Sequence, residues 1–298
     1  MVRPFVTIGL PTYNGARFLR ETLDSLFAQE VDDFELVISD NGSSDQTESI
    51  CRSYARDPRV RYERSPENRG AAWNYNQVLA LARGRYFKWA ADDDLCQPTF
   101  LSRCVEAIEG SPSTVLAWPQ TILIDESGEQ IGELEDSNLE LHSGDPVARL
   151  EQVLRNRVEW HPVFGVIRVD VLRRTAGIGA FVLADVALLA ELAMLGEFRQ
   201  VPEPLFLRRY HEGRSLVANP SFQAHAAWYD PSKARQRRVL PNANLVRELL
   251  RRTARAPLSP RDRTRASSAV MRYWAAPHWR HIGGEIKRAL PVVGRRWA

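Results

Sequence analysis

The chain has 298 residues, of which 44% are hydrophobic, so it can bury a sizeable core as one large domain or as one domain with an appendage. No apolar run approaches the roughly 18 residues that a membrane-spanning helix needs, and the first residues lead directly into a strand pattern. We therefore expect a cytoplasmic protein without a membrane span. Cys51, Cys96 and Cys104 lack CxxC spacing, which favours reduced thiols over a disulfide framework or a structural zinc site.

The net charge of +3 conceals an uneven distribution along the chain. Residues 233–298 carry 17 Lys and Arg against three carboxylates, which leaves residues 1–232 net acidic. In this tail leucines alternate with arginines, and the tryptophans Trp274 and Trp279 follow. Such a basic amphipathic segment suits an anionic membrane surface, and a solvated helical extension or an oligomer contact explains it equally well. We expect no nucleic-acid binding, because the basic residues accompany no recognition module.

The first hundred residues repeat the sequence of a strand, a polar turn and a helix. Apolar spacing and turn residues predict strands over 6–10, 34–39, 60–63 and 86–91, and helices over 16–29, 45–56 and 71–83. Strands that alternate with helices predict a parallel sheet covered by helices, with its functional loops at the carboxyl edge.

Polar turns follow three of these strands and should meet at that edge. They are residues 11–15, residues 40–45 and the acids Asp92, Asp93 and Asp94. Three adjacent carboxylates cannot continue a buried strand, because each ionised side chain would need a partner on leaving water. A divalent cation bridging to a substrate phosphate would favour such a cluster, and a solvated strand-end turn is the alternative. No GxGxxG follows the first strand and no GxxxxGK[ST] occurs, which argues against dinucleotide and P-loop sites.

The second half of the chain has a less regular pattern. It predicts helices over 99–109, 147–157 and 185–195, and strands over 116–118, 121–124, 163–167 and 198–210, the last interrupted by Pro202 and Pro204. Residues 132–145 are acidic and rich in turn residues, so we expect a mobile excursion there.

Four segments of the first half stand in a distinctive order: VTIGLPTYNG at 6–15, FELVISDNGSSD at 34–45, NRG at 68–70, and GRYF at 84–87 leading into DDD at 92–94. In this order and spacing they resemble the inverting family-2 glycosyltransferases of the GT-A fold, over roughly residues 4–110. A weaker likeness, in which Asp185 opens a helix and His211 and Ser215 follow, extends it to about Val217.

The resemblance implies an α/β, Rossmann-like fold whose mixed, mostly parallel sheet is flanked by helices. A GT-A domain would cover residues 1–220, with a nucleotide-binding half (1–110) and an acceptor half (111–220). Residues 221–298 would form a basic helical extension.

The resemblance also implies a role for each matching residue. Those implied to bind the nucleotide sugar are Pro11, Thr12, Tyr13, Asp40, Asn41, Asn68, Asp92 and Asp94. Those implied to hold Mg²⁺ or Mn²⁺ on the diphosphate are Asp93 and His211. Asp185 would be the general base of the single displacement that inverts the sugar. The ordinary alternatives are a helix cap at Asp185, a surface position at His211 and a helix cap at Asn68.

The sequence thus predicts a metal-dependent inverting glycosyltransferase. It would move a sugar from UDP, dTDP or GDP to a hydroxyl of a glycan, a glycolipid or a polyprenyl-linked acceptor, in the cytoplasm or at the inner face of the plasma membrane. The donor base stays open, because Asn41 stands where the family often has Asp; Ala184 also stands where Glu often precedes the base. The alternatives are a nucleotidyltransferase that makes the sugar nucleotide and a non-catalytic relative that binds glycan or membrane.

Overall fold

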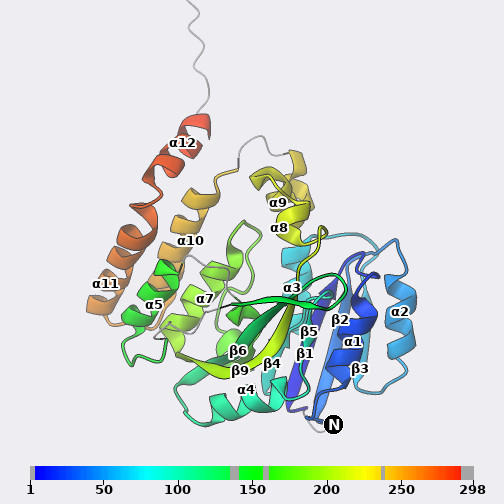
Figure 1. The fold of residues 1–298 in the computed structure, drawn as a ribbon. Helices are drawn as coiled ribbons and strands as arrows, with labels where there is room; N and C mark the ends of the chain where they lie inside the picture. Colours follow the sequence, from blue (N-terminus) through cyan, green and yellow to red (C-terminus); the bar gives the residue numbers. More distant parts are fainter. Residues whose placement is uncertain (1–3, 135–140, 157–160, 236–238, 290–298) are drawn as a thin grey trace, which may run out of the picture.

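Figure 1 shows the computed structural model of the chain, which describes residues 4–134, 141–156, 161–235 and 239–289. Within these residues the strands are β1 (Val6–Thr12), β2 (Phe34–Asp40), β3 (Val60–Arg64), β4 (Tyr86–Trp89), β5 (Leu95–Cys96), β6 (Thr114–Ile124), β7 (Gln130–Leu134), β8 (Val166–Arg168) and β9 (Glu197–Arg209). They form a single sheet in the order β3-β2-β1-β4-β8-β6-β9-β5, and β7 pairs with β6. The mixed sheet flanked by helices confirms the predicted α/β class.

The first half of the sheet is parallel, as the alternation of strands and helices predicts. β1 runs parallel to both β2 and β4, and β2 runs parallel to β3. Every residue of β1, β2 and β4 is buried, because the connecting helices α1 (Leu19–Phe27), α2 (Thr47–Tyr54) and α3 (Ala71–Leu81) cover the sheet. The carboxyl ends of these strands therefore open at one edge.

The second half joins this sheet through an antiparallel strand. β8 pairs antiparallel with β4 on one side and with β6 on the other, and β6 runs parallel to β9. The remaining helices are α4 (Phe100–Glu109), α5 (Pro146–Arg155), α6 (Val169–Leu172), α7 (Ala184–Leu195), α8 (Ser215–Ala218), α9 (Phe222–Tyr229), α10 (Pro241–Arg255), α11 (Pro260–Val270) and α12 (Trp279–Ala289). None of the helices in the described part of the chain is long and apolar enough to cross a membrane.

Prolines do not divide the strands of the second half as predicted. The two strands expected over 116–124 are the single strand β6, and the segment expected to be interrupted is the continuous strand β9. The two strands pair along their length with register shifts around Pro119 and Gln120, where a missing N–H breaks the ladder locally without ending it.

The predictions for residues 163–167 and 132–145 differ in part from the structure. The strand expected over 163–167 begins at Val166, because residues 162–164 form a 3₁₀ turn. Gly132 to Leu134 belong to β7 rather than to an excursion, because they pair with β6. The rest of the predicted excursion includes residues 135–140, which lie outside the described residues.

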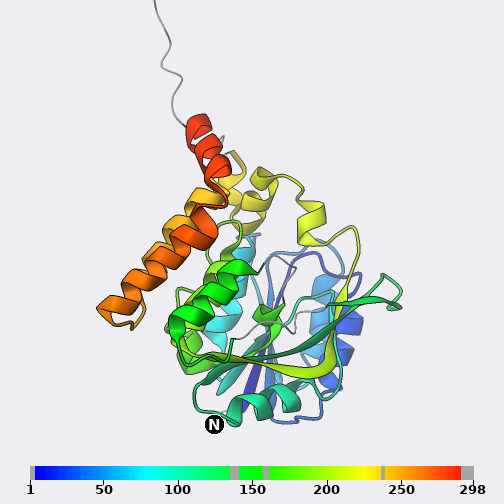
Figure 2. The ribbon, with the colours of Figure 1, turned by 60° about the vertical axis from the view of Figure 1, so that its left-hand side comes forward.

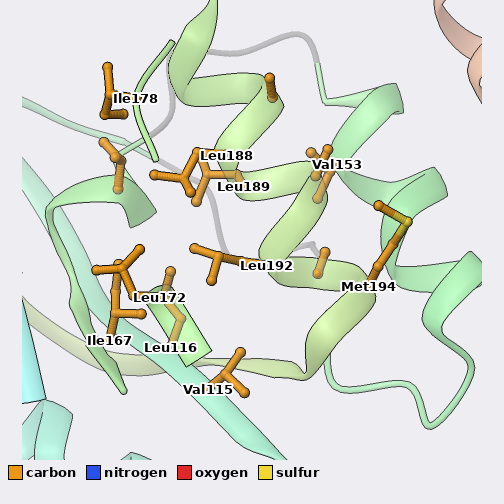
Figure 3. Packing of buried hydrophobic residues seen from close by; sticks show 14 of the residues in the cluster. Val115, Leu116, Val153, Ile167, Leu172, Ile178, Leu188, Leu189, Leu192 and Met194 are labelled. Atoms are coloured by element: carbon orange, nitrogen blue, oxygen red, sulfur yellow. The ribbon is translucent and has the colours of Figure 1, made fainter. Parts of the chain in front are cut away.

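The helices α10 and α11 of the predicted extension pack against the rest of the chain. α10 and α11 lie beside α7 and α5, and α12 points away from the sheet (Figure 2). A single hydrophobic cluster includes Leu188 and Leu192 of α7, Leu116 of β6, and Leu245 of α10. Figure 3 shows Leu188 and Leu192 among the side chains of this cluster, near Leu116 and the other sheet residues. Most residues of α7 are buried, which accounts for the mostly apolar sequence of this helix.

A buried ion pair ties the extension to α7. Arg252 Nη1 donates to Glu191 Oε2 at 2.7 Å, and Arg252 Nη2 donates to the carbonyl oxygen of Gly177 at 3.1 Å. Glu191 Oε2 also accepts from the backbone N–H of Ala176 at 3.1 Å. The Arg252 and Glu191 side chains are 3% and 9% exposed. The attraction between the two charges therefore offsets much of the hydration free energy that each loses on burial.

We predict that Arg252→Ala lowers the free energy of unfolding by about 3–5 kcal/mol, because the Glu191 carboxylate would stay buried without its cation. Urea denaturation followed by tryptophan fluorescence measures the change. The control is Arg251→Ala, whose side chain is 57% exposed and lies 3.8 Å from Glu248, and which should cost less than about 0.5 kcal/mol. Equal losses in the two variants would contradict the prediction.

Candidate active site

A cavity of about 360 Å³ lies at the carboxyl ends of β1, β2 and β4. It brings together residues from the three predicted turns, and the predicted residues in its lining are Pro11, Thr12, Tyr13, Asn41, Asn68, Asp92 and Asp93. Asp40, Asp94 and His211 lie outside this lining. The three turns therefore converge as the parallel topology requires.

The turn after β1 is built for close contact with Asp92. Thr12 Oγ1 donates to Asp92 Oδ2 at 2.5 Å. A Cβ atom at Gly15 would come within 2.2 Å of the same carboxylate oxygen, so a larger residue would displace Asp92. Asn14 adopts a left-handed conformation with φ of 54°, and its side chain accepts from the Ser44 N–H at 2.8 Å. The first turn is thereby fixed to the second.

Asp40 and Asn41 hold the turns together in the free protein. Asp40 is fully buried, and its carboxylate accepts from the Ser43 N–H at 2.8 Å and from Arg64 at 3.2 Å. Asn41 Nδ2 donates to Asn68 Oδ1 at 3.0 Å, which joins the turn after β2 to residues 68–70 after β3. The resemblance implies that Asp40 and Asn41 contact the base of the nucleotide, and this contact stays a prediction. The hydrogen bonds observed here show that both residues also stabilise the turns.

The acidic cluster receives its partners from the end of β9 and the loop beyond it. His211 Nε2 lies 2.9 Å from Asp93 Oδ2. Arg208 Nη1 donates to Asp94 Oδ2 at 2.5 Å, and the backbone N–H of Arg209 donates to Asp94 Oδ1 at 3.0 Å. Asp94 therefore supports the cluster from behind, while Asp92 and Asp93 face the cavity.

The three carboxylates differ in acidity. Burial raises the pKa of Asp92 to about 7, with a contribution from the charge of Asp93 and against the hydrogen bond from Thr12. Burial also raises the pKa of Asp94 to about 6, against the attraction of Arg208. For Asp93 burial acts in the same direction, but the hydrogen bond from His211 and the charge of Arg208 outweigh it and lower the pKa. Asp93 is thus the member of the cluster that stays ionised over the widest pH range.

Sequence reasoning missed two arginines that organise the site. Arg209 is fully buried, and its guanidinium donates to the carbonyl oxygen of Asp93 at 3.0 Å and to Glu21 at 2.7 Å. Arg208 lines the cavity and pairs with Asp94. A signal for them exists in the sequence, because two successive residues of a strand face opposite sides and one of the pair must point inward.

Asn74 also lines the cavity, although the sequence does not predict a role for it. It is 3% exposed, and its Nδ2 donates to the carbonyl oxygen of Thr12 at 3.1 Å. Its Oδ1 is buried and has no hydrogen-bond partner among the described residues. Buried acceptors are nearly always paired, so this oxygen is an exception within the cavity wall.

A second cavity, of about 390 Å³, adjoins the first and contains Asp185. The two cavities share lining residues, among them Tyr75, Phe164 and Arg208. Asp185 is not the cap of α7, since Leu183 holds that position in a left-handed conformation with φ of 69°. Burial raises the pKa of Asp185, against its backbone hydrogen bonds and the nearby His225. The positive end of a helix lowers the pKa of a nearby carboxyl, and at Asp185 burial outweighs this effect.

The donor set at the first cavity suits a cation that is shared with a ligand. No three His, Cys, Asp or Glu side chains converge into a complete metal site within the described parts of the chain. Mg²⁺ is, however, commonly bound by one or two carboxylates together with substrate phosphates. Asp92 and Asp93 supply two carboxylates at a cavity wall, so the residues present fit such a shared site.

Residues 7–174 match the model of the family described as glycosyl transferase family 2, which is more than half of the chain. The chain belongs to this family. It is 38% identical over 95 residues to an uncharacterized glycosyltransferase of Rickettsia typhi, covering 32% of this chain and 29% of the relative. It is 31% identical over 129 residues to a chondroitin synthase of Escherichia coli, covering 43% of this chain and 19% of the relative. The matches span less than a third of the length of these relatives.

Solved structures show the same fold over nearly the whole chain. TarS residues 1–349 from S. aureus superpose with a TM-score of 0.67 at 15% identity, covering 96% of this chain and 81% of TarS. The mannosyltransferase PcManGT from Pyrobaculum calidifontis superposes with a TM-score of 0.56 at 18% identity, covering 97% and 86%. The likeness confirms the GT-A fold that the sequence predicts.

We predict that Asp92→Asn stabilises the metal-free protein at pH 8. The raised pKa of Asp92 means that folding favours the protonated carboxyl, so its stabilisation is complete below the unfolded value near 3.8 and is lost as the pH rises through about 7. An amide removes this loss, and the free energy of unfolding at pH 8 should rise by on the order of 1–3 kcal/mol.

Urea denaturation at pH 8 and at pH 4 tests this expectation, and the difference between the proteins should vanish at the lower pH. Asp33→Asn removes an exposed carboxylate and should change stability little at either pH. If Asp92→Asn were less stable than the natural protein at pH 8, the burial of Asp92 would not be the unfavourable element that we infer.

Proposed function

We propose that this protein is a metal-dependent inverting glycosyltransferase, which moves a sugar from a nucleoside diphosphate to a hydroxyl of a glycan, a glycolipid or a polyprenyl-linked acceptor. One observation carries the proposal. The cavity lined by Asp92 and Asp93 adjoins the cavity that contains Asp185, so a diphosphate anchor and a partly buried base lie in neighbouring cavities. A transfer with inversion needs this separation of leaving group and base.

The first cavity would hold the nucleoside diphosphate. TarS has been solved with UDP and with UDP-GlcNAc, and PcManGT with GDP-Man and Mn²⁺, which supports a nucleotide-sugar donor for this fold. Asn74 Oδ1 and the amides at Asn41 and Asn68 offer hydrogen-bonding groups in the same cavity. UDP, dTDP and GDP are all compatible with the proposal.

Asp93 would hold Mg²⁺ or Mn²⁺ together with Asp92. His211 would orient the Asp93 carboxylate through its 2.9 Å contact, and Arg208 would keep Asp94 behind it. When bound, the cation would supply positive charge to the diphosphate as the glycosidic bond breaks.

Asp185 would accept the proton of the acceptor hydroxyl as that oxygen attacks the sugar. Its burial supports this role, because a carboxylate with a raised pKa is a stronger base than one in water. Its place in the first turn of α7 is fixed by the enclosure of that helix and by the ion pair of Glu191 with Arg252.

The extension is a candidate for contact with an anionic membrane surface, where lipid-linked acceptors reside. Helix α12 exposes the apolar side chains Trp279 and Ile286 together with the basic side chains Arg280 and Lys287. Aromatic and basic residues on one exposed helix favour the interface of an anionic bilayer.

We predict that Asp185→Asn lowers kcat by about 10²–10⁴-fold, the usual contribution of a positioned base, and leaves nucleotide affinity within about twofold. Release of nucleoside diphosphate measures turnover, and calorimetry measures binding. Asp170→Asn is a matched control, because Asp170 is an exposed carboxylate in the first turn of α6. Near-normal kcat in Asp185→Asn, or an equal loss in both variants, would exclude Asp185 as the base.

A further inference from the structure

The cavity that contains Asp185 is walled mostly by apolar side chains. Its volume of about 390 Å³ is in the range of small-molecule pockets, roughly 300–1,000 Å³. The aliphatic residues in its lining are Val153, Val163, Ile178, Leu183, Val186 and Leu189. The aromatic ones are Tyr75, Phe164, Trp228, Tyr229 and Trp274.

The C-terminal extension supplies part of this wall and holds it firmly. The backbone of Tyr229 lies close to Gly70. A Cβ atom at Gly70 would come within 2.5 Å of the Tyr229 carbonyl oxygen. The Tyr229 ring stacks on His225 with a centroid distance of 5.3 Å. Trp274 is 8% exposed and stacks on His278 at 4.5 Å. The aromatic wall is therefore already assembled in the free protein.

The polar and charged residues in the lining are Asn156, His161, Asp185, Arg208, Ser215 and His225. His161 is 5% exposed, and its Nε2 has no hydrogen-bond partner among the described residues, while its Nδ1 lies 3.4 Å from Thr121 Oγ1. A buried ring nitrogen without a partner is unfavourable unless a ligand bonds to it. His161 and Asp185 are thus two of the polar positions in a pocket whose lining is mostly aliphatic and aromatic.

We propose that this cavity binds an apolar group, alkyl or aryl, that the acceptor carries next to its reacting hydroxyl. The hydroxyl would lie at Asp185, a second polar atom at His161, and the apolar group against Trp228, Tyr229 and Trp274. This inference rests on the proposed function and narrows it: the acceptor is a hydroxyl compound with an apolar aglycone, not an unsubstituted glycan. Removal of the apolar group from water supplies the affinity.

The test uses methyl, butyl and hexyl β-glucosides as probes, titrated calorimetrically into the full chain without nucleotide. Affinity should rise about three- to fourfold per methylene until the cavity is full. Val186→Trp fills the cavity from α7 and should abolish this increment. Val163→Phe fills it from another wall, so the test survives if one variant fails to fold. Thermal melting identifies the folded variants.

Ile131→Ser is the control for adventitious alkyl binding, because Ile131 is 56% exposed and lies outside the cavity lining. It should keep the increment. A flat series in the natural protein, an increment that survives both cavity-filling variants, or one lost in Ile131→Ser would overturn the proposal. So would a glucose disaccharide that binds more tightly than hexyl glucoside and is excluded by the same variants, because the pocket would then take sugar rings.

The test also separates this inference from the proposed function. If the alkyl increment appears but no nucleotide sugar is ever turned over, the cavity assignment stands and the transferase proposal fails. If Asp185→Asn abolishes a measured transfer but the alkyl series is flat, the transferase proposal stands and only the inference about the acceptor is lost.

Discussion

The structure depends on holding three adjacent carboxylates where β4 ends. Asp94 is buried, Asp92 and Asp93 are partly buried, and each would repel the others without a compensating neighbour. Most of that compensation comes from the end of β9 and the loop after it, where Arg208, Arg209 and His211 reach the cluster. The pairing of β9 with β5, directly after the acids, delivers these groups in register. The long β6 and β9 pair thus serves the site as well as the core.

The two cavities differ in which part of the chain lines them. The first half of the chain supplies most of the polar cavity at the ends of its parallel strands, and the second half supplies Asp185 and most of the apolar wall. The extension belongs to this arrangement, because Arg252 holds α7 and Trp228 lines both cavities. From its basic composition alone, the extension would be taken for an appendage that contributes nothing to the site.

Local patterns predicted what depends on local sequence. Apolar spacing and turn residues located the strands and helices up to Glu109, apart from the two-residue strand β5, and the order of the turns indicated the edge at which Thr12 and Asp92 meet. Local patterns do not bring distant residues together. Asp93 and His211 lie 118 residues apart, and only the family resemblance placed both at one site. The insertion of β8 between β4 and β6 was not predicted. The acidity of Asp185 also had opposing contributions, and only its burial in the folded chain decided between them.

The central claim is that Asp93 anchors a cation on the diphosphate of a nucleotide donor. Calorimetric titration of UDP, dTDP and GDP, with Mn²⁺ and with EDTA, tests it most directly in the natural protein and in Asp93→Ala. The account predicts that at least one of these nucleotides binds tenfold or more tightly with Mn²⁺, and that Asp93→Ala removes this enhancement. Equal affinity in EDTA, or an enhancement that persists in Asp93→Ala, would contradict the account.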